Sequence, residues 1–135
     1  MRTAPEAFAR GLIVALLACA VAAACGRPDA GADVSVAWTI EPAPPSTGAA
    51  TVAELTLKDE RQQPIRGARL QLEAHMSHPG MSPVTTALAE TGDGVYAGRL
   101  QFSMAGDWLL VVSGQLADGT RFTRQLEVPG VQPAG

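Results

Sequence analysis

Ala68-Arg69-Leu70-Gln71-Leu72-Glu73-Ala74-His75-Met76 is a stretch of this 135-residue chain in which apolar and polar side chains alternate clearly. Successive side chains of a β-strand point to opposite faces, so this alternation predicts a strand with one buried face and one face in water. The same pattern places Met76 on the apolar face and His75 on the polar face. The fold prediction therefore starts from β-structure, with a period of two rather than 3.6.

Other short stretches share this period and are separated by segments with turn-forming residues. Together they predict seven strands, over residues 34–41, 51–58, 68–76, 84–90, 95–102, 108–113 and 121–128. Gly94 and Gly119 lie in short breaks, where tight hairpins need a positive φ. Seven short strands in roughly 100 residues predict an all-β fold, an immunoglobulin-like antiparallel β-sandwich.

The first 25 residues differ in composition from the rest of the chain. Two arginines and one acid occur in residues 1–10, and residues 11–24 are small or apolar apart from Cys19. This apolar run is short for a span of roughly 30 Å of hydrocarbon, so it predicts a signal peptide. Three alanines directly before Cys25 resemble a bacterial lipobox, in which the cysteine carries a lipid. A second lipobox ending at Cys19 and an uncleaved signal anchor are the alternatives.

These observations predict a simple domain organisation. Residues 1–25 form the lipoprotein signal peptide, 26–32 a flexible tether, 33–129 the sandwich and 130–135 a disordered tail. In each alternative the folded part lies outside the cytoplasm. We expect it on the periplasmic side of the cell envelope, bound to the inner or the outer membrane through Cys25.

Charge and motifs exclude several classes of function. The chain has 10 basic and 13 acidic residues, a net charge of −3, and no basic cluster, so nucleic acid is not an expected partner. No nucleophile elbow, phosphate-binding glycine loop, Cys-x-x-Cys or His-Glu-x-x-His pattern occurs. We therefore expect a binding protein, not an enzyme.

Scarce donor side chains gather in one part of the sequence. After Cys25 the chain has two histidines and three methionines, which are His75, Met76, His78, Met81 and Met104. Imidazole suits many transition metals, whereas the soft thioether favours Cu(I). A set of histidines and methionines without cysteine therefore predicts copper before zinc.

Strand alternation predicts where these donors meet. If the strand over residues 68–76 runs upward, the segments 77–83, 103–106 and 42–48 all turn at the top. The donors then converge at one end of the sandwich, where loops on a rigid scaffold commonly bind ligands. Ordinary structural roles remain open: Met76 as a core residue, His75 as an exposed strand residue, and Met104 as a plug of the sandwich end.

Several of these motifs together resemble a known family. The order Trp38-Thr39-Ile40-Glu41-Pro42, His75-Met76, Pro79-Gly80-Met81, Gly94-Val95-Tyr96 and Phe102-Ser103-Met104-Ala105-Gly106-Asp107-Trp108 is similar to YtkA-like and FixH-like extracytoplasmic domains. The resemblance spans residues 34–128. It implies a membrane-tethered immunoglobulin-like sandwich associated with copper handling and cytochrome oxidase maturation. FixH-like members usually have a transmembrane anchor, whereas this chain is predicted to have a lipid anchor.

Two functions follow as hypotheses. In the first, a lipid-anchored periplasmic protein holds Cu(I) for a metal-acceptor or oxidase-assembly protein. In the second, the same loops, together with the proline-rich segment 42–45, contact a membrane-protein partner without metal. A solute-binding accessory domain is a third, weaker hypothesis, because the loops offer few aromatic side chains to stack on a sugar.

Overall fold

The computed structural model describes residues 33–135. Within this range the chain forms seven strands and no helix. The strands are β1 (Ser35–Glu41), β2 (Ala50–Lys58), β3 (Arg69–Met76), β4 (Val84–Gly92), β5 (Val95–Gln101), β6 (Gly106–Gln115) and β7 (Arg121–Val131). The described part of the chain contains no helix long and apolar enough to span a membrane. The predicted signal peptide, the lipid attachment at Cys25 and the tether lie outside the described residues.

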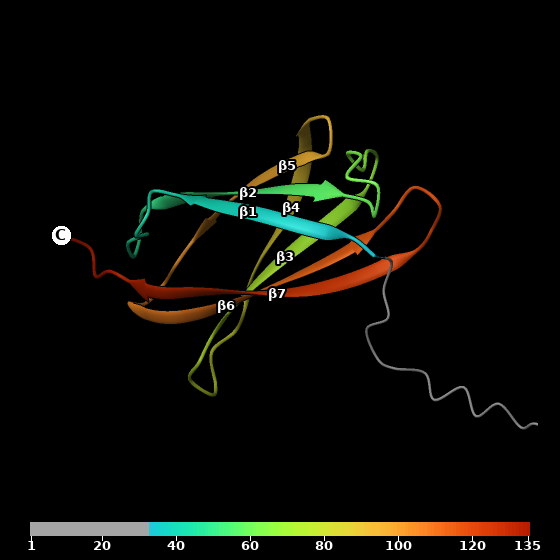
Figure 1. Cartoon of the computed structure of the whole chain (residues 1–135). Coiled ribbons are helices and arrows are strands. Elements are labelled where there is room, and N and C mark those ends of the chain that lie inside the picture. Colours follow the sequence, from blue (N-terminus) through green and yellow to red (C-terminus); the bar gives the residue numbers. More distant parts are fainter. Residues whose placement is uncertain (1–32) are drawn as a thin grey trace, which may run out of the picture.

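All neighbouring strands are antiparallel, in the order β1-β2-β5-β4-β3-β6-β7. This order matches the two layers of an immunoglobulin sandwich, with β1, β2, β5 and β4 in one and β3, β6 and β7 in the other. Figure 1 shows these layers facing each other. The predicted all-β immunoglobulin-like sandwich is therefore confirmed.

The strand β4 joins the two layers into one nearly closed sheet. Its residues 84–88 pair with β3, and its residues 89–92 pair with β5. The register of the β4–β5 pairing shifts between Glu90 and Gly92. A strand that changes layers in this way leaves only β1 and β7 as sheet edges.

The C-terminal residues correct one prediction. We expected 130–135 to be a disordered tail, but β7 continues to Val131, which is buried. Beyond it, the backbone N–H of Gln132 donates to the carbonyl of Pro45, and Thr47 N–H donates back to Gln132. Pro129 is tolerated because β7 is an edge strand. Pro45 and Thr47 of the 42–48 segment thus find backbone partners in the C-terminal segment.

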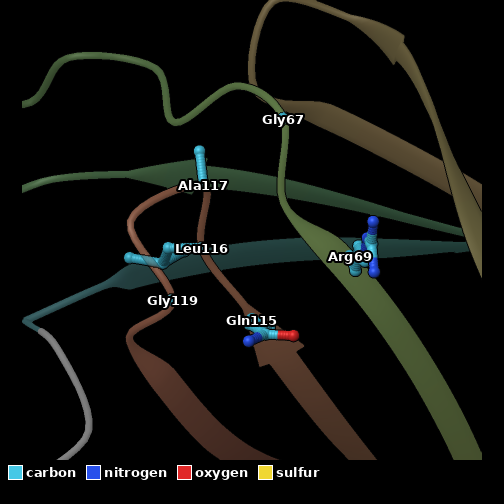
Figure 2. Close-up of a pocket in the computed structure, with 6 residues that line it drawn as sticks. All are labelled: Gly67, Arg69, Gln115, Leu116, Ala117 and Gly119. Carbon is cyan, nitrogen blue, oxygen red and sulfur yellow. The ribbon is translucent and has the colours of Figure 1, made fainter.

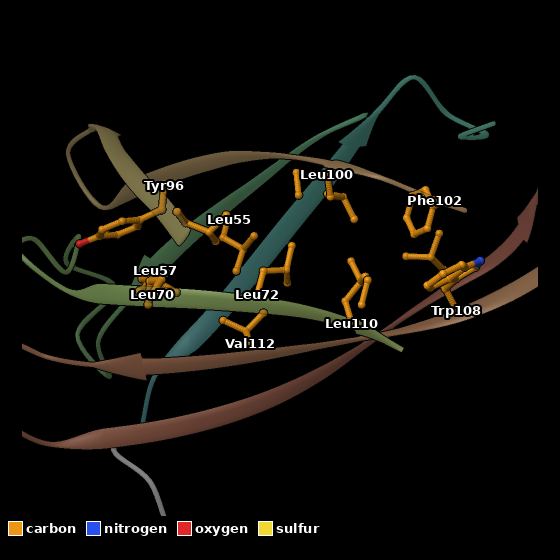
Figure 3. Close-up of a cluster of buried hydrophobic side chains, with 14 of the residues drawn as sticks. Leu55, Leu57, Leu70, Leu72, Tyr96, Leu100, Phe102, Trp108, Leu110 and Val112 are labelled. Atoms are coloured by element: carbon orange, nitrogen blue, oxygen red, sulfur yellow. The ribbon is translucent and has the colours of Figure 1, made fainter. Parts of the chain in front are cut away.

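The core lies between the two layers and follows the predicted alternation. In β2, for example, every second residue from Thr51 to Leu57 is buried. Figure 3 shows Tyr96 at one end of the buried cluster and Phe102 and Trp108 at the other. The rings of Phe102 and Trp108 meet edge to face, with centroids 5.1 Å apart. Such aromatic contacts contribute more than the buried area alone.

Gly114 of β6 tests how tightly this core is packed. A methyl group at Gly114 would overlap the Phe122 ring and come within 2.8 Å of Leu70 Cδ2. We predict that Gly114→Ala lowers the free energy of unfolding by about 1–3 kcal/mol, because overpacking forces neighbours to move. Urea unfolding followed by tryptophan fluorescence measures this change. The neighbouring exposed Ser113→Ala is the control, and equal stability of both variants would show that the core is looser than described.

Tyr96 links the loop between β2 and β3 to the core through hydrogen bonds. Its ring is fully buried at the start of β5. Its hydroxyl donates a hydrogen bond to the carbonyl of Ile65 at 2.8 Å and accepts one from Ala68 N–H at 3.1 Å. Burial raises the pKa of Tyr96 above its ordinary 10.0, and the negative charge of Glu90 adds to the effect, while the bond from Ala68 opposes it.

Because Tyr96 is the only tyrosine in the chain, its titration can be followed directly. The pKa of Tyr96 is higher in the folded chain than in the unfolded chain. The contribution of the neutral Tyr96 hydroxyl to the free energy of unfolding is therefore complete below about pH 10, and it is lost as the pH rises through the folded pKa. We predict that ultraviolet absorbance detects phenolate formation at higher pH in the folded chain than in urea. Tyr96→Phe should lose about 1–3 kcal/mol of stability at neutral pH and this alkaline dependence. Identical folded and unfolded titration curves would contradict the account.

Candidate metal centre

The end of β3 and the start of β6 bring several predicted donors to one end of the sandwich. Met76, the last residue of β3, lies opposite Trp108 of β6. Residues 77–83 therefore leave the sandwich where residues 102–105 enter it. The 42–48 segment joins them, since Gly48 N–H donates to the carbonyl of Phe102 at 3.0 Å. The three loops thus lie at the same end, as strand alternation predicts.

Met76 is half-buried and packs against the core from this end. A Cβ placed on Gly106 would lie 3.4 Å from the terminal methyl carbon of Met76. Gly106 has a φ angle of +125°, a backbone conformation that residues other than glycine rarely adopt. The end of the Met76 side chain therefore lies against Gly106, two residues after Met104.

The turn before β6 holds its backbone firmly and exposes its methionine. The indole N–H of Trp108 donates to the carbonyl of Met104 at 3.0 Å, and the Trp108 ring is buried against Phe102. The Met104 side chain itself is 46% exposed. A buried aromatic side chain thus holds the backbone of Met104, whose thioether side chain is accessible from solvent.

The loop of residues 77–83 carries the next two donors. Its first residue is tied to the neighbouring turn, because the Ser77 hydroxyl donates to the carbonyl of Asp107 at 3.3 Å. His78 is exposed and Met81 is 43% exposed. Figure 1 shows this yellow-green loop projecting from the body of the sandwich. The base of the loop is therefore bonded to the start of β6, and the two donors farther along the loop are exposed to solvent.

His75 is separated from its neighbour Met76 by the pleat of β3. Its ring lies on the outer face, where Nε2 is 3.2 Å from a carboxylate oxygen of Glu73. The structure therefore brings Met76 and the Met104 turn together but places His75 on the opposite face of the sheet. Sequence proximity alone could not show this separation, although the alternation of residues 68–76 does.

The composition of this end limits the metals that it suits. Within residues 33–135, no three or more His, Cys, Asp or Glu side chains gather closely enough to hold a metal ion. A metal at this end would therefore need thioether ligands. Thioethers are soft donors, so this end fits Cu(I) better than zinc or a hard cation.

Gly106 and Trp108 are positioning residues that sequence reasoning did not assign to the site. In the sequence, Trp108 stood out only as the last residue of a motif that resembles the YtkA-like and FixH-like families. The signal was the short spacing Met104-Ala105-Gly106-Asp107-Trp108, in which a glycine and an indole donor follow a methionine. A hollow of about 380 Å³ lies beside this segment and is lined by Ser77, Asp107 and Glu127 among others.

Two solved structures resemble this domain, both at low sequence identity. No curated protein matches the chain. Among solved structures, the PmoD soluble domain from Methylocystis sp. ATCC 49242 (Rockwell) is 13% identical, with a TM-score of 0.48 over 76% of this chain and 98% of that one. An engineered protein, target OR128, is 16% identical with a TM-score of 0.45, over 75% of this chain and 20% of that one.

A comparison with protein families matches residues 30–113, which is more than half of the chain. The matched range includes β1 to β5 and the part of β6 that carries Trp108. The resemblance that the motifs indicated is thereby confirmed for one of its two families. The chain belongs to the YtkA-like family.

Proposed function

We propose that this protein binds Cu(I) at the methionine-bearing end of the sandwich and passes it to an acceptor protein. One observation carries the proposal: Met76 reaches the Met104 turn from the core side, and Met81 lies on the adjoining loop. All three methionines of residues 33–135 thus belong to one end of the molecule. Met76, Met81 and Met104 are the proposed sulfur ligands, and His78 is a further candidate.

The exposure of these ligands suits transfer better than storage. A thioether is neutral and carries no proton, so it binds Cu(I) without first losing one. Two of the three methionine side chains are more than two-fifths exposed, which allows an incoming ligand to attack the metal from solvent. The proposed role is binding and transfer, without catalysis.

The location of this activity is part of the same proposal. We place the sandwich on the periplasmic side of the envelope, held to a membrane by a lipid on Cys25. Such a tether would keep the protein near membrane-bound acceptors, for which an oxidase-assembly protein is the candidate. Support comes from the membership in the YtkA-like family and from the resemblance of residues 22–25 to a lipobox.

An anaerobic titration tests the proposal. Protein produced from the full chain and purified in detergent is titrated with Cu(I) in the presence of a competing chelator. We predict one tight site, which is weakened at least about tenfold in the double variant Met76→Leu, Met104→Leu. Leucine nearly conserves the volume of methionine, so the fold should lose less than about 1.5 kcal/mol per exchange.

His75→Gln is the matched control, because His75 lies on the opposite face of β3 and should not affect the affinity. Loss of binding in His75→Gln with full binding in the methionine variant would contradict the proposed ligand set. No saturable binding at all would contradict the copper function. The exposed methionines would then favour the interaction module, in which the same end contacts a partner without metal.

A further inference from the structure

Two arginines flank a glutamine across three neighbouring strands, at the opposite end of β3 from the methionines. Arg69 of β3 lies opposite Gln115 of β6, and Gln115 lies opposite Arg121 of β7. Directly opposite residues of antiparallel strands share a face, so all three side chains are on the outer face. We name these three residues the arginine row.

Residues of the arginine row line two hollows of the surface. One, of about 380 Å³, is formed by Arg69, Gln115 and the hairpin that connects β6 to β7. The other, of about 330 Å³, is formed by the whole row together with Gln71 and Ser113. Figure 2 shows Arg69 and Gln115 on adjacent strands, with Leu116, Ala117 and Gly119 of the hairpin beyond Gln115. No acidic side chain lines either hollow.

The arginines of the row have no partner among residues 33–135, although the domain is acidic. The side chains of Arg69 and Arg121 make neither a hydrogen bond nor an ion pair within this range. Three carboxylates at this end have other partners. Asp93 pairs with Arg66, Glu90 accepts a bond from Gly67 N–H, and Asp118 accepts one from Thr120 N–H. Two positive charges are therefore left facing solvent beside uncharged hydrogen-bonding groups.

We propose that the arginine row binds a phosphate group. Opposite strands are about 4.8 Å apart, so the Cα atoms of the two arginines lie about 10 Å apart. Their long side chains can therefore converge on one anion above Gln115. Two guanidinium forks offer more donors than one carboxylate can accept, whereas a phosphate group has enough oxygen atoms for both. The Gln115 amide and the Ser113 hydroxyl supply further donors.

Two kinds of ligand carry such a phosphate group, free phosphate and a phospholipid headgroup. Leu116, which lines one hollow of the row, also lines a hollow with Asp33, where the described chain begins. The row is thus close to the end at which residues before Asp33 join the sandwich. A tether to a membrane through those residues would bring headgroups near the row.

An NMR titration tests the site and separates the two sources. Protein from the full chain, in a phosphate-free detergent, is titrated with inorganic phosphate and, separately, with glycerophosphoglycerol, a soluble headgroup phosphodiester. Sodium chloride keeps the ionic strength constant. We predict saturable shifts of the Gln115 and Arg121 amide signals. Tighter binding of inorganic phosphate assigns the free ion, and tighter binding of the phosphodiester assigns the headgroup.

Charge-matched variants distinguish the row from general electrostatic attraction. Arg69→Gln, Arg121→Gln should weaken binding at least about tenfold. Arg99→Glu lowers the net charge by the same two units at an exposed position of β5 and should leave the affinity within about twofold. Thermal unfolding confirms that all variants are folded. Equal losses in the double variant and in Arg99→Glu, or no saturable shift beyond that caused by chloride, would overturn the proposal.

Discussion

Eight consecutive residue pairs join β3 to β6, from Arg69 opposite Gln115 to Met76 opposite Trp108. This pairing joins residues that are 32 to 46 positions apart in the chain, and it determines what each end of the sandwich presents. At one end it places Met76 beside the turn of Met104. At the other end, about 23 Å away at roughly 3.3 Å per residue, it places Arg69 beside Gln115.

The register of this pairing matters as much as its existence. A slip by one residue would turn every inward side chain of β3 outward, because side chains alternate between faces. The buried Leu70, Leu72 and Ala74 make such a slip costly, since each fills space in the core. Core packing thus keeps Met76 on the inner side and His75 on the outer side. The chemistry of the candidate centre depends on a constraint that comes from hydrophobic burial.

Sequence patterns predicted most of the fold because burial of one face leaves a visible alternation. They also predicted that the loops after β3 and before β6 share one end. They could not show that β4 divides its pairing between two layers, since the change of partner between Leu88 and Ala89 leaves no mark in the alternation. Sequence patterns also could not show that the C-terminal segment is structured, because Pro129 and Gly130 are typical of a chain leaving a fold. The hydrogen bonds of Gln132 to the 42–48 segment connect residues far apart in sequence, so no local pattern indicates them.

The candidate centre was predictable in its residue types but not in its arrangement. His75 and Met76 are neighbours in sequence and lie on opposite faces, whereas Met76 and the Met104 turn are distant in sequence and adjacent in space. NMR of methyl-labelled methionine during anaerobic addition of Cu(I) tests this arrangement most directly, because the sequence after Cys25 contains just these three methionines, Met76, Met81 and Met104. The account predicts that the Met76, Met81 and Met104 signals shift together and stop at one equivalent. A shift of Met81 alone, or no shift of Met76, would contradict it.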